Sequence, residues 1–233
     1  MTLEYRVHKN ILVQILIDVY SDTTISPYLG FKGGTAAYLF YGLERFSVDI
    51  DLDLLDESKK ELVLGKIEGI LKNYGDLKEG KHNNHGALFL LAYNSKKKNH
   101  QNVKIDINYR DFESEYEIKT FNGISMLVMK TKDMFAHKLV AMYERMEETK
   151  RDVFDVWFFS KNNWEVNREI IRKRTGKEYK EFLADCIQRL EKLDNKNILF
   201  GLGELIDDSQ KDWVKAKLKT ETIVQLKLRF DAE

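Results

Sequence analysis

The sequence is poor in cysteine, has no net charge and contains no long apolar run. Its one cysteine, Cys186, excludes an internal disulfide and a metal site built from several cysteines. Basic and acidic residues balance at 38 each, so net charge gives no argument for a nucleic-acid partner, and any basic surface must be local. The longest early apolar run, Ile11–Val19, is interrupted by Gln14 and Asp18 and is too short to span a bilayer.

The first ten residues, MTLEYRVHKN, are charged and lack the pattern of a signal peptide. We therefore expect a cytoplasmic protein with no membrane partner. A length of 233 residues allows one large domain or two modest ones. A hydrophobic content of 43% is enough for a sizeable core.

Three aspartates alternate with apolar residues near the end of the stretch Lys32–Leu55, as Asp49, Asp51 and Asp53. This alternation predicts a strand with one apolar face. Asp49 and Asp51 would then lie side by side, about 7 Å apart at their bases. That spacing suits carboxylates converging on two divalent cations held about 3.5–4 Å apart. A solvated edge strand is the alternative, and Asp53 is expected to be a solvated or strand-end residue.

A glycine pair precedes this strand, followed by a hydroxyl and a short helical run. Gly33 and Gly34 let the backbone approach a ligand closely, and Thr35 lies at the predicted start of a helix over 36–42. Amide groups at a helix start attract phosphate, and a glycine turn before it can form an anion-binding nest. A glycine pair alone is usually a turn. With the aspartates it indicates a site for a nucleoside triphosphate.

The stretch GGTAAYLFYGLERFSVDIDL resembles the first motif of the nucleotidyltransferase superfamily, and more narrowly that of the AbiEii/AbiGii toxin family. The family's Arg-x-Ser/Thr-x-Asp-x-Asp run is matched by Arg45, Ser47, Asp49 and Asp51. Its later lysine and Arg-Asp-x-x-Asp motif are matched by Lys138, Arg151, Asp152 and Asp155. The resemblance covers most of residues 30–160. It implies a toxin of a toxin–antitoxin or phage-defence pair, with a separately encoded antitoxin. For some relatives the acceptor is the 3′ end of tRNA.

A second predicted strand, over 103–109, carries Asp106 on its polar face. The superfamily commonly has a third acid in a following strand, and Asp106 is the candidate. The alternative is an exposed strand aspartate.

A helix predicted over 132–148 places Lys138 and Arg145 almost one below the other, seven residues apart. The resemblance implies that Lys138 steadies triphosphate charge, although a solvated helix face is the usual place for lysine. Asp152 and Asp155 follow in an aromatic-rich helix and share a face. A buried carboxylate needs a partner, so either these aspartates form structural ion pairs or one of them shapes the active site.

Two other basic segments are candidates for nucleic-acid contact: the lysine loop Lys96–Lys98 and the cluster over Arg168–Lys177. Each is more simply a solvated surface. His82 and His85 lie in a stretch, 77–86, that reads as an irregular loop without a third ligand.

Together these features predict an α+β fold. A nucleotidyltransferase-like mixed sheet with flanking helices would span residues 1–125, and a helical domain over 126–233 would close the active-site cleft. The predicted reaction is a Mg²⁺- or Mn²⁺-dependent transfer of a nucleoside monophosphate from an NTP to RNA, with release of pyrophosphate. DNA is not an expected partner. The alternatives are a small-molecule enzyme of the aminoglycoside type and a non-catalytic binding module on the same fold.

The predicted residues fall into two groups. The catalytic group is Asp49, Asp51, Asp106, Lys138 and Asp152, of which the first three are metal ligands. The nucleotide-binding group is Gly33, Gly34, Thr35, Arg45, Ser47 and Lys138. For Ser47 the sequence leaves two roles open: it positions the aspartates, or it is a modification site.

Overall fold

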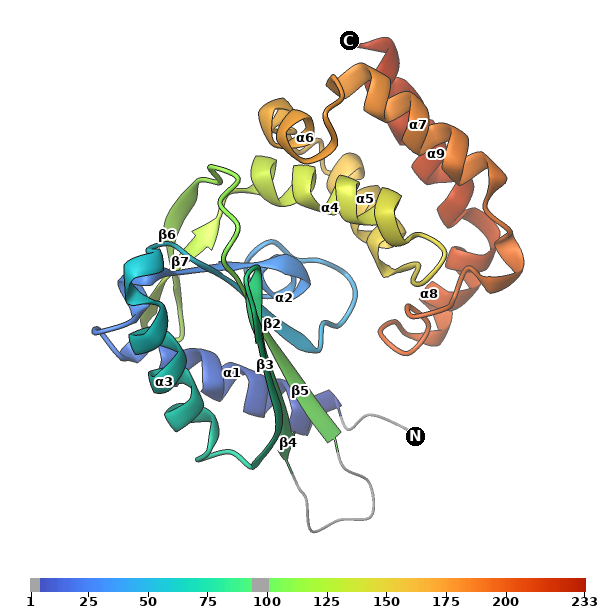
Figure 1. The fold of residues 1–233 in the computed structure, drawn as a ribbon. Helices are drawn as coiled ribbons and strands as arrows, with labels where there is room; N and C mark the ends of the chain where they lie inside the picture. The colour runs from blue at the N-terminus through green and yellow to red at the C-terminus, as the bar shows by residue number, and fades with distance from the viewer. Residues whose placement is uncertain (1–4, 94–100) are drawn as a thin grey trace. The chain divides into compact units, whose positions relative to one another are not determined.

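The computed structural model describes residues 5–93 and 101–233, and the chain forms two compact units. The first unit comprises Met1–Gly42, Ser47–Asp111 and Glu115–Met129, and the second comprises Leu43–Phe46, Phe112–Ser114 and Lys130–Glu233. The first contains a mixed sheet with helices, and the second is helical (Figure 1). The predicted α+β fold class is confirmed.

A mixed sheet of seven strands organises the described part of unit 1. Its strands are β1 (Leu29–Lys32), β2 (Asp49–Leu54), β3 (Asp76–Asn83), β4 (Gly86–Tyr93), β5 (Gln101–Asn108), β6 (Tyr116–Phe121) and β7 (Ile124–Met129). Their order is β3-β4-β5-β2-β1-β7-β6. The pairs β2–β5 and β1–β7 are parallel, and the other neighbours are antiparallel. The strand β2 therefore lies inside the sheet, with a neighbour on each side.

Alternation along β2 gives the sheet two different faces. Ile50 and Leu52 are buried on one face, together with Phe31 of β1 and Ile105 of β5. Helix α1 (Tyr5–Ser21) packs against β2, β5 and β7, and α3 (Lys60–Leu71) packs against α1 and β4. Helix α2 (Gly33–Phe40) contacts β1 and β2 and follows β1 without a break. The aspartates of β2 point to the face opposite the apolar one.

The prediction of an irregular loop over 77–86 is wrong for most of that segment. Residues Asp76–Asn83 form β3, which pairs antiparallel with β4, and a turn before Gly86 connects the two strands. The segment lacks the apolar alternation of a half-buried strand because β3 is an edge strand. Its neighbour β4 supplies backbone hydrogen bonds, and a charged edge also resists pairing with other chains.

Unit 2 is built from helices. They are α4 (Thr131–Arg145), α5 (Arg151–Lys161), α6 (Arg168–Thr175), α7 (Tyr179–Lys192), α8 (Asp208–Trp213), a π-helical turn (Val214–Leu218) and α9 (Lys219–Asp231). Helix α5 is buried along nearly its whole length and packs against α4 and α9. In the described ranges, no helix is both long enough and apolar enough to cross a bilayer.

Gly30 provides the first test of this packing. A Cβ at Gly30 would lie 2.6 Å from Cζ of Tyr116, whose ring covers β1 at this point. We predict that Gly30→Ala lowers the free energy of unfolding by about 1–3 kcal/mol, because the ring must move. Urea denaturation would measure the change.

Gly65→Ala is the matched control, because Gly65 lies exposed within α3 and a Cβ there would meet nothing within 4 Å. It should raise the free energy of unfolding by about 0.5–1 kcal/mol, through helix propensity. Equal effects of the two substitutions would contradict the assigned packing of Tyr116.

Candidate functional site

The glycine pair begins α2 directly after β1. Gly33 has a φ of +78°, a conformation that residues with side chains rarely adopt. A Cβ at this position would also lie 2.8 Å from Cγ of Asp51. The Asp51 carboxylate therefore rests against the backbone of Gly33, and glycine is required for both reasons. Lys32, the N-cap residue, makes no side-chain hydrogen bond to the helix start.

The predicted metal-binding aspartates lie together on the polar face of the sheet. Asp51 is the register partner of Asp106 on the parallel strand β5, and Asp49 is the register partner of Lys104. Neighbouring strands lie about 4.8 Å apart, so Asp51 and Asp106 are adjacent. Lys104 Nζ lies 3.1 Å from Asp106 Oδ2, and both side chains are partly exposed.

Carboxylate oxygens are the donors that Mg²⁺ and Mn²⁺ prefer. Asp51 and Asp106 are placed by register to share a cation, with Asp49 on the same face. In residues 5–93 and 101–233, however, the side chains form no cluster of three or more His, Cys, Asp or Glu able to hold a metal ion. The donor chemistry and backbone positions fit a divalent cation, and the side chains are not converged on one.

Of the two alternatives for Asp53, the strand-end position agrees with the structure, since Asp53 is the last residue but one of β2, and the solvated position is wrong. Its residue exposure is 7%, and its carboxylate accepts hydrogen bonds from Lys32 Nζ at 2.5 Å, Asn108 Nδ2 at 2.6 Å and Tyr116 Oη at 2.6 Å. The expectation of a solvated side chain was wrong because β2 is an interior strand, which alternation alone cannot reveal. Burial and the charge of Asp53 raise the pKa of Tyr116, which therefore remains a donor.

Thr35 and Ser47 connect the start of α2 to β2. The Thr35 hydroxyl donates to the backbone carbonyl of Asp49 and lies 2.9 Å from the Ser47 hydroxyl. Both residues are buried. Of the two roles left open for Ser47, this contact favours positioning, since modification requires an accessible hydroxyl. The Thr35 side chain is likewise directed at β2, which leaves its backbone amide as the group at the helix start.

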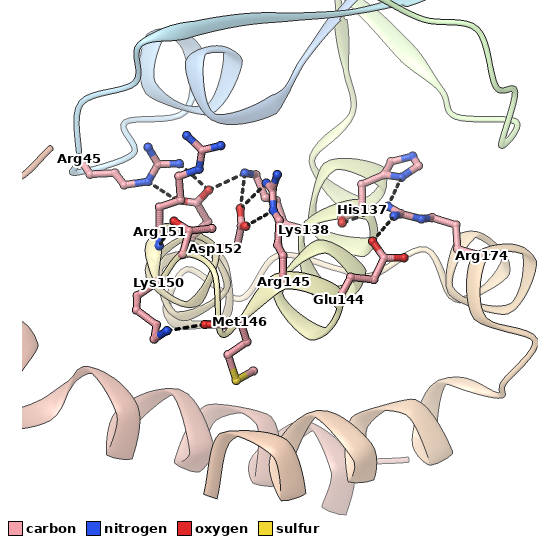
Figure 2. A network of polar contacts seen from close by, with 12 residues as sticks. Arg45, His137, Lys138, Glu144, Arg145, Met146, Lys150, Arg151, Asp152 and Arg174 are labelled. Carbon is pink, nitrogen blue, oxygen red and sulfur yellow. Dashed lines mark hydrogen bonds and ion pairs between the residues drawn. The ribbon is translucent and has the colours of Figure 1, made fainter. Parts of the chain in front are cut away.

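A network of three cations around two buried carboxylates lies in unit 2 (Figure 2). Lys138 Nζ on α4 lies 2.8 Å from Asp152 Oδ1 and 2.9 Å from Asp155 Oδ2 on α5. Arg145 donates to Asp152 from Nε at 2.7 Å and from Nη2 at 3.2 Å. Arg45 donates to Asp155 from Nε at 2.5 Å and from Nη2 at 2.7 Å. Lys138 thus bridges the two aspartates.

The cations keep these carboxylates charged despite their burial. Burial alone would raise the pKa of Asp152 and Asp155, but the neighbouring Lys138, Arg145 and Arg45 charges outweigh it and hold both pKa values below the ordinary range. Burial alone would lower the pKa of Lys138, but the two carboxylates outweigh it and raise that pKa. At neutral pH the network therefore carries three positive and two negative charges.

Several of the predicted site residues belong to this network, and their contacts and exposure differ. Arg45, predicted to bind nucleotide, is 3% exposed and holds Asp155 in a two-pronged ion pair within unit 2. The structural ion pair offered as one alternative for Asp152 and Asp155 is present. The side chain of Lys138 is 11% exposed and that of Arg145 is 39% exposed, so both cations are in part accessible to solvent. Arg151 is the first residue of α5 and directly precedes Asp152 (Figure 2).

The basic cluster over Arg168–Lys177 is largely neutralised by acids. Arg168 pairs with Glu233, Arg172 with Glu169, Lys173 with Glu113, Arg174 with Glu144, and Lys177 with Asp185. This pairing favours the interpretation of a solvated face. The loop Lys96–Lys98 lies outside the described residues.

Three residues that were not predicted from the sequence donate hydrogen bonds to Asp53: Lys32, Asn108 and Tyr116. A signal for Lys32 was available, since it directly precedes the glycine pair. Tyr116 is 63 residues from Asp53, and no local pattern links the two.

Unit 2 also contains an aromatic pocket of about 340 Å³, lined in part by Phe154, Trp157 and Trp213 with Glu44 and Glu221. Trp157 Nε1 donates to Glu221 Oε2 at 3.0 Å. The pocket includes none of the predicted site residues.

Comparison with known proteins finds a family whose model matches most of the chain. The family model described as nucleotidyl transferase AbiEii toxin, type IV TA system, matches residues 14–228. No curated protein sequence matches the chain.

Solved structures share the fold. A putative nucleotidyltransferase from Helicobacter pylori is 22% identical with a TM-score of 0.67, covering 100% of this chain and 97% of that one. JHP933 from Helicobacter pylori is 21% identical with a TM-score of 0.62, covering 100% and 94%. MenT4, nucleotidyltransferase toxin Rv2826c from Mycobacterium tuberculosis H37Rv, is 15% identical with a TM-score of 0.57, covering 93% and 82%.

Removing the Arg45 cation should strongly destabilise the protein. Arg45→Met leaves Asp155 buried with Lys138 as its cationic partner, so we predict a loss of about 3–5 kcal/mol in the free energy of unfolding. Arg172→Met removes an exposed pair with Glu169 and should change stability little. Chemical denaturation of both variants would measure this, and similar losses would contradict the buried network.

The network also predicts a pH dependence. Asp152 has a lowered pKa when folded, so its charge stabilises the protein above the unfolded pKa of about 3.9, and this contribution is lost as pH falls towards the folded value. The difference in unfolding free energy between the wild-type protein and Asp152→Asn should therefore shrink from about pH 5 to pH 2. A difference that stays constant or grows would contradict the lowered pKa.

Proposed function

The chain belongs to the nucleotidyltransferase AbiEii toxin family of type IV toxin–antitoxin systems, and we propose that it transfers a nucleoside monophosphate to RNA. The donor is a nucleoside triphosphate, the acceptor is the 3′ end of a tRNA, and Mg²⁺ is required. The hydroxyl oxygen of the acceptor forms a bond to the α-phosphorus. The bond from that phosphorus to the bridging oxygen breaks, pyrophosphate leaves with the electron pair, and the proton of the acceptor hydroxyl passes to solvent.

One observation carries the proposal: the contact of Asp51 with Gly33 at the start of α2, beside Asp106 on β5. This joins the two chemistries that the reaction needs. Backbone amides at a helix start bind phosphate oxygens, and carboxylates in reach of them bind divalent cations. Few structural roles would require both in one place, since a row of acids is costly to keep without a compensating charge.

Within this proposal the residues of unit 1 have separate tasks. Gly33, Gly34 and the amide of Thr35 bind the phosphate chain. Asp49, Asp51 and Asp106 would hold two Mg²⁺ ions, and the metal would supply a lower pKa for the attacking hydroxyl and positive charge for the leaving pyrophosphate. The Thr35 hydroxyl and Ser47 position Asp49 through its backbone carbonyl.

For Lys138 of unit 2, the resemblance implies that its ammonium group stabilises negative charge on the nucleotide. Lys138 is charged and bridged between Asp152 and Asp155. Asp152 and Asp155 position Lys138, and Arg45 acts through Asp155. Within unit 2 the two aspartates hold the ammonium group of Lys138 in one position, and a preorganised cation requires no rearrangement during a reaction. Closure of the nucleotide site by the helical unit stays a prediction.

The assignment of tRNA as the acceptor rests on the resemblance to relatives that modify tRNA. The net charge of zero and the paired cluster over Arg168–Lys177 offer no independent support for RNA. Membership of a toxin–antitoxin family supports a separately encoded antitoxin as a partner. The acceptor therefore has to be identified by experiment.

The test incubates the purified protein with total tRNA, Mg²⁺ and each labelled nucleoside triphosphate in turn. We predict label in RNA with the wild-type protein, and a rate at least about 100-fold lower with Asp51→Asn, because a metal ligand is lost. A chelator should abolish the reaction.

Asp76→Asn is the matched control, since it makes the same substitution at an exposed position on β3 of the same sheet. It should leave the rate unchanged. Transfer by Asp51→Asn at the wild-type rate would refute the assigned site. Binding of Mg²⁺ and nucleotide without labelled RNA would instead indicate another acceptor, such as a small molecule.

A further inference from the structure

Lys32 occupies the point where three features of unit 1 meet. It is the last residue of β1, the N-cap of α2 and the register partner of Asp51 on β2. Directly paired residues on neighbouring strands share a face of the sheet. Lys32 therefore lies on the polar face that carries Asp51, one residue before Gly33.

The ammonium group of Lys32 is held in place by Asp53. Lys32 Nζ lies 2.5 Å from Asp53 Oδ1, and Asn108 Nδ2 donates to the same oxygen at 2.6 Å. Tyr116 Oη donates to the other oxygen, Oδ2, at 2.6 Å. The missing side chain at Gly30 leaves room for the Tyr116 ring. Asp53 is thus fixed from three directions and in turn fixes Lys32.

This arrangement separates Asp53 from the other two aspartates of β2. Its oxygens already accept three hydrogen bonds, so little capacity remains for a metal ion. An ammonium group, by contrast, has three N–H donors. In the described part of the chain, Asp53 is the one partner of the Lys32 side chain, which is 22% exposed. Two donors of Lys32 therefore remain available for a ligand on the polar face.

We propose that Lys32 is a nucleotide-binding residue whose ammonium group contacts the phosphate chain, with Asp53, Asn108 and Tyr116 as its positioning residues. The inference rests on the proposed function, because it places Lys32 at the same phosphate site. Lys32 adds to the helix start a full positive charge in a set position. A lysine that binds phosphate acts as a point charge, so its position determines its effect.

The pairing with Asp53 explains how such a lysine avoids the wrong partner. Asp49, Asp51 and Asp106 lie on the same face, and a flexible ammonium group could pair with them in place of a metal ion. Lys104 pairs with Asp106 in this way. By binding Lys32 firmly, Asp53 keeps its ammonium group from competing for the metal-binding carboxylates while leaving it two donors for phosphate.

The experiment compares Lys32→Gln with Lys119→Gln in steady-state transfer and in equilibrium binding of the nucleoside triphosphate that the wild-type protein uses. Lys119, on β6 of the same sheet, also pairs with an acid, its Nζ lying 3.1 Å from Glu117 Oε1, and its side chain is 29% exposed. We expect Lys32→Gln to raise KM and the dissociation constant by about 10- to 100-fold, the loss of one charged contact. Lys119→Gln should leave both unchanged.

A purely structural role for Lys32 makes different predictions. Lys32→Arg retains a cation and should recover most of the affinity for the triphosphate. The weaker binding of Lys32→Gln should extend to inorganic tripolyphosphate with Mg²⁺ and should be absent for the corresponding uncharged nucleoside. Asp53→Asn, which keeps the lysine charge but loosens its position, should give a smaller increase in KM. Thermal unfolding of each variant would show that it is folded.

The outcomes separate this inference from the function on which it rests. Transfer by the wild-type protein with an unchanged KM in Lys32→Gln would overturn the role of Lys32 alone. Equal losses of nucleoside and triphosphate binding would do the same, since they indicate a distorted fold. Absence of nucleotide binding and of transfer in the wild-type protein would overturn both proposals.

Discussion

The position of β2 inside the sheet is the constraint on which the rest of unit 1 depends. Its antiparallel pairing with β1 sets Lys32 opposite Asp51, and its parallel pairing with β5 sets Asp106 beside Asp51. A slip of one residue in either register would move the aspartates to the apolar face. Burial of Ile50 on that face therefore fixes the polar side as well. The hydrophobic core and the candidate site are determined by the same alternation.

Four aspartates show two different ways of accommodating a negative charge. Asp53 and Asp155 are buried, and each is held by a cation and by further donors, so that their charge is compensated within the protein. Asp51 and Asp106 lie on a partly exposed polar face. A buried charge without a partner is very costly. A partly exposed carboxylate, by contrast, is solvated by water and can bind a cation from solution. The first kind builds the framework, and the second is suited to binding.

The glycine pair and the aspartate row were predictable because both are local patterns. Gly33 precedes a helix, and Asp49 and Asp51 alternate with apolar residues, so spacing alone assigns a turn and a strand face. The expectation of a solvated Asp53 was wrong because alternation cannot distinguish an edge strand from an interior one. Likewise Arg45 matches a motif beside the aspartates, yet its side chain pairs with Asp155, which is 110 residues away.

By itself, the sequence determined which residues could carry charge on a shared face: the period of two along β2 and of 3.6 along α4 are properties of the local backbone. Tertiary structure decided which of those charged side chains form ion pairs with one another. Lys32 with Asp53, and Lys138 with Asp152, are brought together by strand pairing and helix packing over 21 and 14 residues of chain. Ion pairing depends on distance and burial in space, and neither is encoded in a local pattern of residues.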